Sequence, residues 1–418
     1  MKKIVIDGGT KLRGSIRISG SKNASLPILA ASILFNNKIT LKNVPRVRDI
    51  FTMIKLLETL GKKISFNKDK LEVYPKKTNN YFADYKLVKT MRAGILVLGP
   101  LLSKFKKAKV SLPGGCAIGA RPVDLHINFL DQAGYENNIL KGYVESKIIK
   151  NIKNISYKFK QISVGATETA ILNVCCSNKK VVLKNIAIEP EIVDLINFLN
   201  KAGARIKFLS KRSILIEGVS KLKSTEYKIM PDRIEAGTYL IAGAITKGEI
   251  QLNNINLKDI KNIVQVLKKA NVKIKPLSNS SVQVNSKKIK NLNIATDAYP
   301  GFPTDMQAQL MSLLCFAKGK SKLKEKIFEN RFLHVLELQR MGANIQIKDR
   351  SAIVTGVKNL SGAEVMATDL RASVCLVLAG LAAKGRTIIN RIYHLERGYE
   401  NLVGKLRKCG AKIKLINA

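Results

Sequence analysis

The order of apolar and polar residues is repeated six times along the chain. Each time, a polar and a small residue precede a mostly apolar run typical of a buried helix. Further on, a Gly or Asn ends a second helix at the position of a left-handed cap, and a strand begins. These end positions recur about every 70 residues, which predicts six copies of one unit. The helix starts lie at Asn23, Arg92, Glu168, Glu235, Gln307 and Arg371, and the helix ends at Gly61, Gly134, Gly203, Asn271, Gly342 and Gly410.

The fourth copy shows the pattern in detail. Residues 234–246 are mostly apolar and predict a buried helix, and residues 248–252 alternate as in a strand. Within 258–270 the apolar residues have helical spacing, and another strand begins at Val272. We therefore predict an α/β protein whose repeated unit combines two helices with strands, of the βαβαββ type.

Six units divide most simply into two domains of three. The first ~20 residues predict an extra strand pair that packs on the second domain, so the chain crosses between domains near residues 20 and 230. The predicted domains are 20–229, and 1–19 together with 230–418. Two lobes of equal size predict a ligand site in the cleft between them. A solenoid without catalysis is the alternative, but the residue pairs at the six helix starts differ from one another, and a pure scaffold has less reason to place long polar side chains there.

Composition leaves three classes of partner open. The chain has 418 residues, 46% of them hydrophobic, as in a globular protein, and a formal net charge of +43. Such a charge suits nucleic acid, an anionic membrane or an acidic small substrate. The lysines are scattered beside Ile and Asn, which favours drift in composition, and Trp is absent, so base-stacking platforms are scarce. We expect no specific nucleic acid, and keep a nucleic-acid-binding protein as the alternative.

Six cysteines are scattered without a Cys-x-x-Cys pair or a histidine at metal-ligand spacing. This pattern disfavours a metal site and suits a reducing compartment. The N-terminus lacks the apolar core of a signal peptide, and no apolar run reaches the ~20 residues of a membrane span. We therefore expect a cytoplasmic protein that uses no metal, no cofactor and no membrane.

Candidate chemistry begins with the segment 112–125, which is rich in Gly and Pro and predicts a loop. It carries Cys116 close to Arg121, and a thiol near cationic groups can be reactive. Cys116, Asp305 and Asp369 are candidates for proton transfer, although both aspartates also suit helix N-caps. Six cations in loops or at helix starts are either ordinary surface charges or binding residues for a phosphate or carboxylate group. They are Lys22, Arg92, Arg121, Arg331, Arg371 and Arg397.

Seven segments in this order resemble one enzyme family: 19–24, 113–125, 163–167, 299–309, 328–332, 367–373 and 396–400. The chain is similar over its whole length to the UDP-N-acetylglucosamine 1-carboxyvinyltransferases, the enolpyruvyl transferases of peptidoglycan synthesis. The Cys116 loop distinguishes them from the sister transferases that act on shikimate 3-phosphate, which stay the nearer alternative. The resemblance implies two inside-out, barrel-like α/β domains of three units each, with an active-site cleft that closes on substrate.

The resemblance also implies the reaction and its residues. Phosphoenolpyruvate would give its enolpyruvyl group to the sugar 3-hydroxyl through a tetrahedral intermediate, with Asp305 as base and Cys116 as acid, in a monomer without cofactor. The residues implied in catalysis are Cys116, Asp305, Lys22, Arg397 and Asp369. Those implied at phosphoenolpyruvate are Lys22, Asn23, Arg121, Arg331, Arg371 and Arg397. Those implied at the nucleotide sugar are Asn23, Arg92, Arg121, Pro122, Val123, Asp124, Leu125, His126, Gln161, Ser163, Val164, Gly165, Asp305, Ile327 and Phe328. Family members often carry Lys where this chain has Gln161, so either Gln161 or Lys160 would reach the nucleotide.

Overall fold

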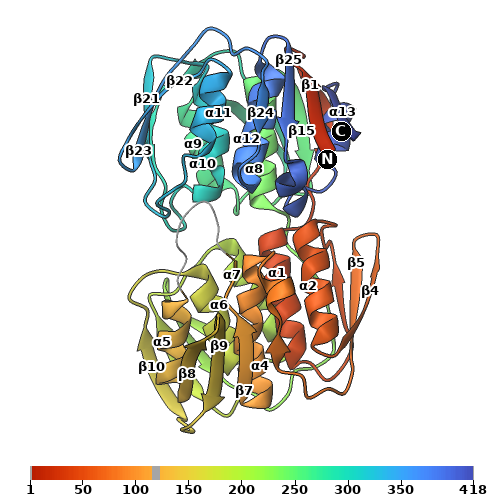
Figure 1. Cartoon of the computed structure of the whole chain (residues 1–418), viewed down its shortest axis with the longest axis vertical. Helices are drawn as coiled ribbons and strands as arrows, with labels where there is room; N and C mark the ends of the chain where they lie inside the picture. Colours follow the sequence, from red (N-terminus) through yellow and green to blue (C-terminus); the bar gives the residue numbers. More distant parts are fainter. Residues whose placement is uncertain (1, 115–122, 418) are drawn as a thin grey trace. The chain divides into compact units, whose positions relative to one another are not determined.

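A computed structural model describes residues 2–114 and 123–417 of the chain (Figure 1). These residues form two compact units. The inserted unit comprises residues 20–114 and 123–230, and the terminal unit comprises residues 2–19 and 231–417. Each unit is described by itself below.

Three four-stranded sheets with one pairing pattern occur in each unit. In the third repeat the first strand pairs in parallel with the second strand. The third and fourth strands form an antiparallel hairpin, and the fourth strand pairs antiparallel with the second. The sequence therefore predicted the βαβαββ unit correctly, because its two periodicities are local. The elements of this repeat are β10 (Asn154–Lys158), α6 (Val164–Val174), β11 (Lys180–Lys184), α7 (Pro190–Lys201), β12 (Arg205–Ser210) and β13 (Ser213–Glu217).

The first two repeats complete the inserted unit. The first consists of α1 (Lys22–Ala31), η1 (Ser32–Leu34), β3 (Ile39–Lys42), α2 (Arg48–Thr59), β4 (Lys62–Asn67), β5 (Lys70–Pro75) and β14 (Thr225–Lys228). The second consists of β6 (Phe82–Ala83), α3 (Tyr85–Val88), η2 (Arg92–Val97), α4 (Leu98–Phe105), β7 (Lys107–Ser111), α5 (Asp124–Gln132), β8 (Tyr135–Leu140) and β9 (Tyr143–Ile148).

The other three repeats form the terminal unit. The fourth consists of β2 (Arg13–Arg17), α8 (Arg233–Ile245), β15 (Glu249–Asn253), α9 (Lys261–Lys269), β16 (Lys273–Ser278) and β17 (Ser281–Asn285). The fifth consists of β19 (Asn293–Ala295), η3 (Thr304–Met306), α10 (Gln307–Leu314), β21 (Lys320–Lys324), α11 (His334–Arg340), β22 (Asn344–Lys348) and β23 (Ser351–Thr355), beside the short pair β18 (Ile289–Lys290) and β20 (Ala317–Lys318). The sixth consists of β24 (Glu364–Met366), α12 (Leu370–Ala382), β25 (Arg386–Asn390), η4 (Ile392–Arg397), α13 (Leu402–Lys408), β26 (Lys412–Asn417) and β1 (Lys2–Asp7).

Strands from distant parts of the chain close each unit. β14 is parallel to β3 in the inserted unit, and β2 is parallel to β15 in the terminal unit. β1 lies between β25 and β26 and is antiparallel to both. The expected pairing of the two N-terminal strands with each other is therefore wrong: each completes a different sheet, because each of those repeats lacks one strand.

Helices lie inside each unit and sheets lie outside. All 13 residues of α8 are buried, and α8, α10 and α12 pack on one another. In the inserted unit α4 packs on α6. The strands bury alternate residues, so each sheet turns one face to these helices. This is the inside-out arrangement that the resemblance implies (Figure 1).

The predicted left-handed helix ends are confirmed at all six positions. The backbone φ is 82° at Gly61, 91° at Gly134, 95° at Gly203, 65° at Asn271, 89° at Gly342 and 89° at Gly410. Each of these residues follows the second helix of its repeat. Of the predicted helix starts, Glu168 is wrong by four residues, because α6 begins at Val164, and Arg92 begins a 3-10 helix instead of an α-helix.

Candidate functional site

Asp305 lies between two buried arginines in the terminal unit. Its Oδ1 is 2.8 Å from Arg331 Nη2, and its Oδ2 is 2.6 Å from Arg371 Nη2. The arginine side chains are 4% and 7% exposed, against 29% for Asp305. The ordinary alternatives are therefore wrong here: these arginines are not surface charges, and the Asp305 carboxylate binds guanidinium groups instead of capping a helix.

Polar side chains from α8 and α10, together with Tyr399 from the loop between η4 and α13, hold Arg371 in place. Its Nη1 donates to Tyr399 Oη at 3.3 Å, and that hydroxyl is 2.9 Å from Thr238 Oγ1. Gln309 Nε2 donates to the carbonyl oxygen of Asp305 at 2.8 Å. Burial opposes the charge on Arg371, but the Asp305 carboxylate, with smaller contributions from Tyr399 and Asp232, more than offsets it and raises the pKa of Arg371. Arg371 is therefore a permanently charged anchor for an anion.

Asp369 has the helix-cap role that its residue type allows. Its Oδ1 accepts hydrogen bonds from the amides of Arg371 at 2.7 Å and Ala372 at 3.2 Å, so it caps α12, in which Arg371 is the second residue. His334 is buried nearby. Burial lowers the pKa of His334 to about 4, with Asp369 opposing the shift and Arg331 contributing to it. His334 is therefore neutral near pH 7. A catalytic role for Asp369 stays a prediction.

Lys22 is the first residue of α1 in the inserted unit. Ser21 caps this helix by accepting from the amide of Ala24 at 3.2 Å. Lys22 Nζ lies 3.4 Å from Asp49 Oδ2, and the two side chains are 13% and 5% exposed. Asn23 follows in the same first turn and is half-buried. Sequence reasoning missed Asp49, since an aspartate in the first turn of a helix usually has a local role.

A second cluster in the inserted unit surrounds His126. Its Nδ1 is 2.9 Å from Thr169 Oγ1, and a Cβ atom at Gly165 would lie 3.1 Å from its ring. Glycine thus lets the ring approach the start of α6, which Ser163 caps through the amide of Ala166. Burial lowers the pKa of His126 to about 4, and Arg92 adds to the shift. The structure thereby brings together the predicted nucleotide residues of segments 123–126 and 163–165 with Arg92.

The remaining predicted residues are more dispersed. Cys116, Arg121 and Pro122 lie outside the described residues. Arg397 is half-buried at the end of η4, and Lys160 and Gln161 are both exposed, so the choice between the latter two stays open. Ile327 and Phe328 lie in the turn before Arg331, whose guanidinium is 5.4 Å from the Phe328 ring centre. Their amides bind the buried carboxylate of Glu325, which no sequence pattern indicated.

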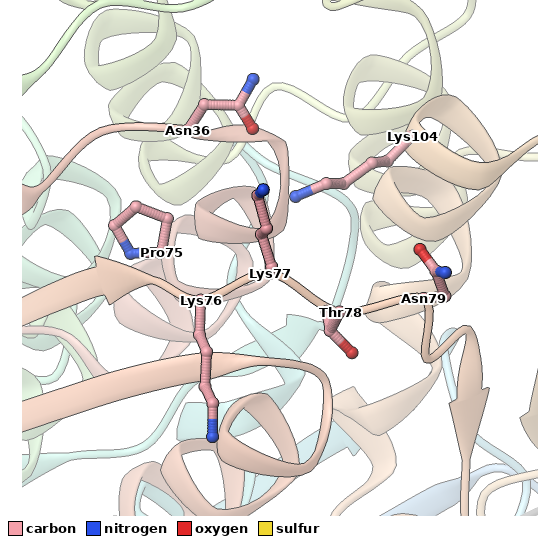
Figure 2. A pocket seen from close by; sticks show the side chains of 7 residues that line it. All are labelled: Asn36, Pro75, Lys76, Lys77, Thr78, Asn79 and Lys104. Atoms are coloured by element: carbon pink, nitrogen blue, oxygen red, sulfur yellow. The ribbon is translucent and has the colours of Figure 1, made fainter.

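An open cavity of about 650 Å³ in the inserted unit is lined by Asn36, Pro75, Lys76, Lys77, Thr78, Asn79 and Lys104 (Figure 2). None of the predicted site residues is among them. In Figure 2, Lys77 and Lys104 point into the space beneath Asn36, whereas Lys76 turns to the other side. Exposed lysines are expected across a chain of such high positive charge, so we assign no ligand to this cavity.

Two other features of the described part concern metals and membranes. No group of three or more His, Cys, Asp and Glu side chains there has the spacing of a metal site. None of the described helices is both long and apolar enough to cross a membrane.

Comparison with known proteins places the chain among the enolpyruvyl transferases. An EPSP synthase (3-phosphoshikimate 1-carboxyvinyltransferase) family model matches residues 6–406. The solved enolpyruvyl transferase NikO from Streptomyces tendae has the same fold, with a TM-score of 0.90 at 22% identity over 100% of this chain and 99% of that one. A UDP-N-acetylglucosamine 1-carboxyvinyltransferase from Pelagibacter ubique (strain HTCC1062) is 57% identical over 100% of both chains. One from Geotalea uraniireducens (strain Rf4) is 51% identical over 99% of both. The chain belongs to the family of UDP-N-acetylglucosamine 1-carboxyvinyltransferases.

Proposed function

We propose that the protein transfers the enolpyruvyl group of phosphoenolpyruvate to the 3-hydroxyl of UDP-N-acetylglucosamine and releases phosphate. The observation that carries the proposal is Asp305 held between Arg331 and Arg371. Guanidinium groups bind carboxylate and phosphate in matched geometry, and phosphoenolpyruvate carries both groups. Family membership supplies the acceptor, since the relatives from Pelagibacter ubique and Geotalea uraniireducens are both named UDP-N-acetylglucosamine 1-carboxyvinyltransferases.

The ion pairs of Asp305 suggest how binding and proton transfer are connected. An incoming carboxylate or phosphate competes with Asp305 for the two guanidinium groups. Once released from one of them, a carboxylate oxygen of Asp305 becomes available to accept the proton of the sugar 3-hydroxyl, as a general base requires. Arg331 and Arg371 then stabilise the anionic groups of phosphoenolpyruvate, together with Lys22, Arg121 and Arg397.

The remaining roles complete an addition–elimination reaction. Cys116 gives a proton to the methylene carbon of phosphoenolpyruvate, while the deprotonated hydroxyl attacks the neighbouring carbon. Loss of phosphate from this tetrahedral intermediate, together with transfer of one methyl proton back to the Cys116 thiolate, restores the double bond. Arg92, His126 and Ser163 lie in the inserted unit and would hold the nucleotide, with Asn23 at the sugar. We place the enzyme in the cytoplasm as a monomer, with domains 20–229 and 1–19 plus 230–418.

Phosphate release from phosphoenolpyruvate tests the proposal. We expect release with UDP-N-acetylglucosamine and none without an acceptor. Release with shikimate 3-phosphate instead would assign the sister reaction. Absence of release with either acceptor, from a sample shown by circular dichroism to be folded, would reject the proposal.

A further inference from the structure

The Glu325 carboxylate is buried and accepts four hydrogen bonds. It follows β21, and the residue is 1% exposed. Its Oε1 accepts from Thr296 Oγ1 at 2.8 Å, from the amide of Ile327 at 2.8 Å and from that of Phe328 at 3.2 Å. Its Oε2 accepts from Thr304 Oγ1 at 3.0 Å. Among the described residues no Lys, Arg or His forms an ion pair with it, so neutral donors alone satisfy this charge.

These four donors come from three separate segments. Thr296 directly follows β19, Thr304 is the first residue of η3, and Ile327 and Phe328 form the turn after Glu325 itself. Thr296 Oγ1 also accepts from the amide of Lys326 at 3.0 Å, so the hydroxyl bonds both to the carboxylate and to the turn. A single side chain therefore ties three segments together.

Two of these three segments carry or adjoin a residue of the proposed site. Thr304 immediately precedes Asp305, and the Phe328 ring lies under the guanidinium of Arg331. Ile327 and Phe328 are predicted contacts of the nucleotide sugar. Displacement of the Glu325 carboxylate would therefore shift Asp305 and this turn together.

The chemistry favours orientation over simple stability. Removing a carboxylate from water is expensive without a cationic partner, so a buried turn would be held at lower cost by a neutral side chain. Hydrogen bonds to a carboxylate are shorter and about twice as strong as neutral ones. Reacting groups must be held to within about 0.5 Å, and residues behind the substrate contacts provide that precision.

We propose that Glu325 is a positioning residue, which orients Asp305 and the turn 326–328 toward the acceptor sugar. The inference rests on the proposed function for the identity of that sugar. Glu325 itself does not touch the reacting atoms in this proposal; it acts through Thr304 and through the backbone of the turn.

Glu325→Ala and Glu325→Gln separate hydrogen-bond geometry from charge. Gln keeps an oxygen for the three donors at Oε1, and its amide can donate to the Thr304 hydroxyl oxygen. We expect Glu325→Ala to lower kcat/KM for UDP-N-acetylglucosamine by about 10-fold or more, and Glu325→Gln to stay within about 3-fold of wild type. Wild-type kinetics in Glu325→Ala, or equal impairment in both variants, would overturn the proposal.

Smaller changes cover the case in which Glu325→Ala does not fold. Thr304→Val removes only the hydroxyl that reaches Oε2 and should lower kcat/KM in the same direction. Thr387→Val is the matched control, since this buried threonine lies in the same unit and its hydroxyl has no partner among the described residues. Equal kinetics in the two threonine variants would contradict the inference.

Hydrogen–deuterium exchange provides a readout that does not need turnover. The amides of Ile327 and Phe328 should exchange faster in Glu325→Ala than in wild type. In Glu325→Gln they should exchange at the wild-type rate. Unchanged exchange in Glu325→Ala would overturn the positioning role. The phosphate assay on the wild-type protein decides the proposed function, whereas the Glu325 variants decide the positioning role. Failure of the proposed function is therefore distinguishable from failure of the positioning role.

Discussion

At the scale of single residues, Asp305 and Asp369 show that one residue type has two roles. Both lie where a helix begins, and an aspartate there suits a cap or a base equally well. Asp369 accepts two amide hydrogen bonds and caps α12. Asp305 binds two guanidinium groups that come from elsewhere in the sequence. The difference depends on which side chains the fold brings near each carboxylate.

Asp305→Asn should remove both stability and activity. The substitution leaves Arg331 and Arg371 buried without their counter-charge, which destabilises the folded chain. Because Asp305 is partly exposed, water screens part of this effect, and we expect a loss of about 1–3 kcal/mol in the free energy of unfolding. Phosphate release should fall by about 100-fold or more, because a base is lost. Asp297→Asn is the control, since its partner Lys326 is exposed and the change should be nearly neutral. A wild-type rate in Asp305→Asn would exclude Asp305 as the base.

His126 predicts acid sensitivity of the inserted unit. Its pKa is about 4 in the folded chain, below the ordinary 6.5, because burial opposes the charged ring. Between pH 6.5 and pH 4 the unfolded chain binds more protons at this site, so stability falls as pH falls through this window. The loss is at most about 3 kcal/mol by pH 4. Denaturant unfolding at pH 7 and pH 4 should show a smaller difference in the free energy of unfolding for His126→Gln than for wild type. An equal difference in the two proteins would contradict this origin.

At the scale of elements, one device ends the second helix of all six repeats. Gly occupies five of these ends and Asn the sixth, all with positive φ. In four of them the residue after the cap donates its amide back to the last turn, at Ala204, Val272, Ala343 and Ala411. The chain can then turn directly into the next strand. The device is local in sequence, which is why it could be predicted at every repeat.

Gly342 offers a clean test of this device, because no atom within 4 Å would meet an added Cβ. Gly342→Ala should lower the free energy of unfolding by about 1–2 kcal/mol through backbone conformation alone. Gly342→Asn should lose less, since Asn tolerates this conformation and already occupies it at Asn271. Thermal and denaturant unfolding measure both. Equal loss in the two variants would mean that side-chain contacts decide the effect.

At the scale of the whole molecule, the order of strands in space differs from their order along the chain. β1 occupies the place that the last strand of the repeat has in other sheets, and Lys2 pairs with Asn417 across β1 and β26. Ile4, Val5 and Ile6 of β1 are buried. The sixth repeat is therefore complete only when both ends of the described chain meet in one sheet.

A circular permutant tests this closure. Joining Asn417 to Lys2 by a two-residue hairpin turn converts β26 and β1 into the hairpin of an ordinary repeat. New ends between Lys141 and Gly142 fall at the exposed tip of β8 and β9. We expect the permutant to fold and to retain phosphate release. The thermal unfolding midpoint measures the folding, and the phosphate assay measures the activity. Deletion of residues 2–7 is the contrasting variant and should unfold the terminal unit. A permutant that fails to fold would contradict the equivalence of the repeats.

Local patterns determined much of this protein in advance. Helical and strand periods, together with Gly or Asn at helix ends, act over a few residues, so they identify six α/β units and their helix ends without any knowledge of the fold. The sequence also indicated Asp305, Arg331 and Arg371 as candidates, because they lie within segments that resemble the enolpyruvyl transferases; from their sequence contexts alone, the arginines could equally have been surface charges and Asp305 a helix cap.

Long-range burial decided the rest. Which strand completes which sheet depends on unpaired edges far apart in the sequence, so β1 and β2 join different sheets instead of each other. The ion pairs of Asp305 and the four hydrogen bonds of Glu325 likewise join segments that only packing brings together. A buried carboxylate must find donors wherever the fold provides them, and no local pattern records where those donors are.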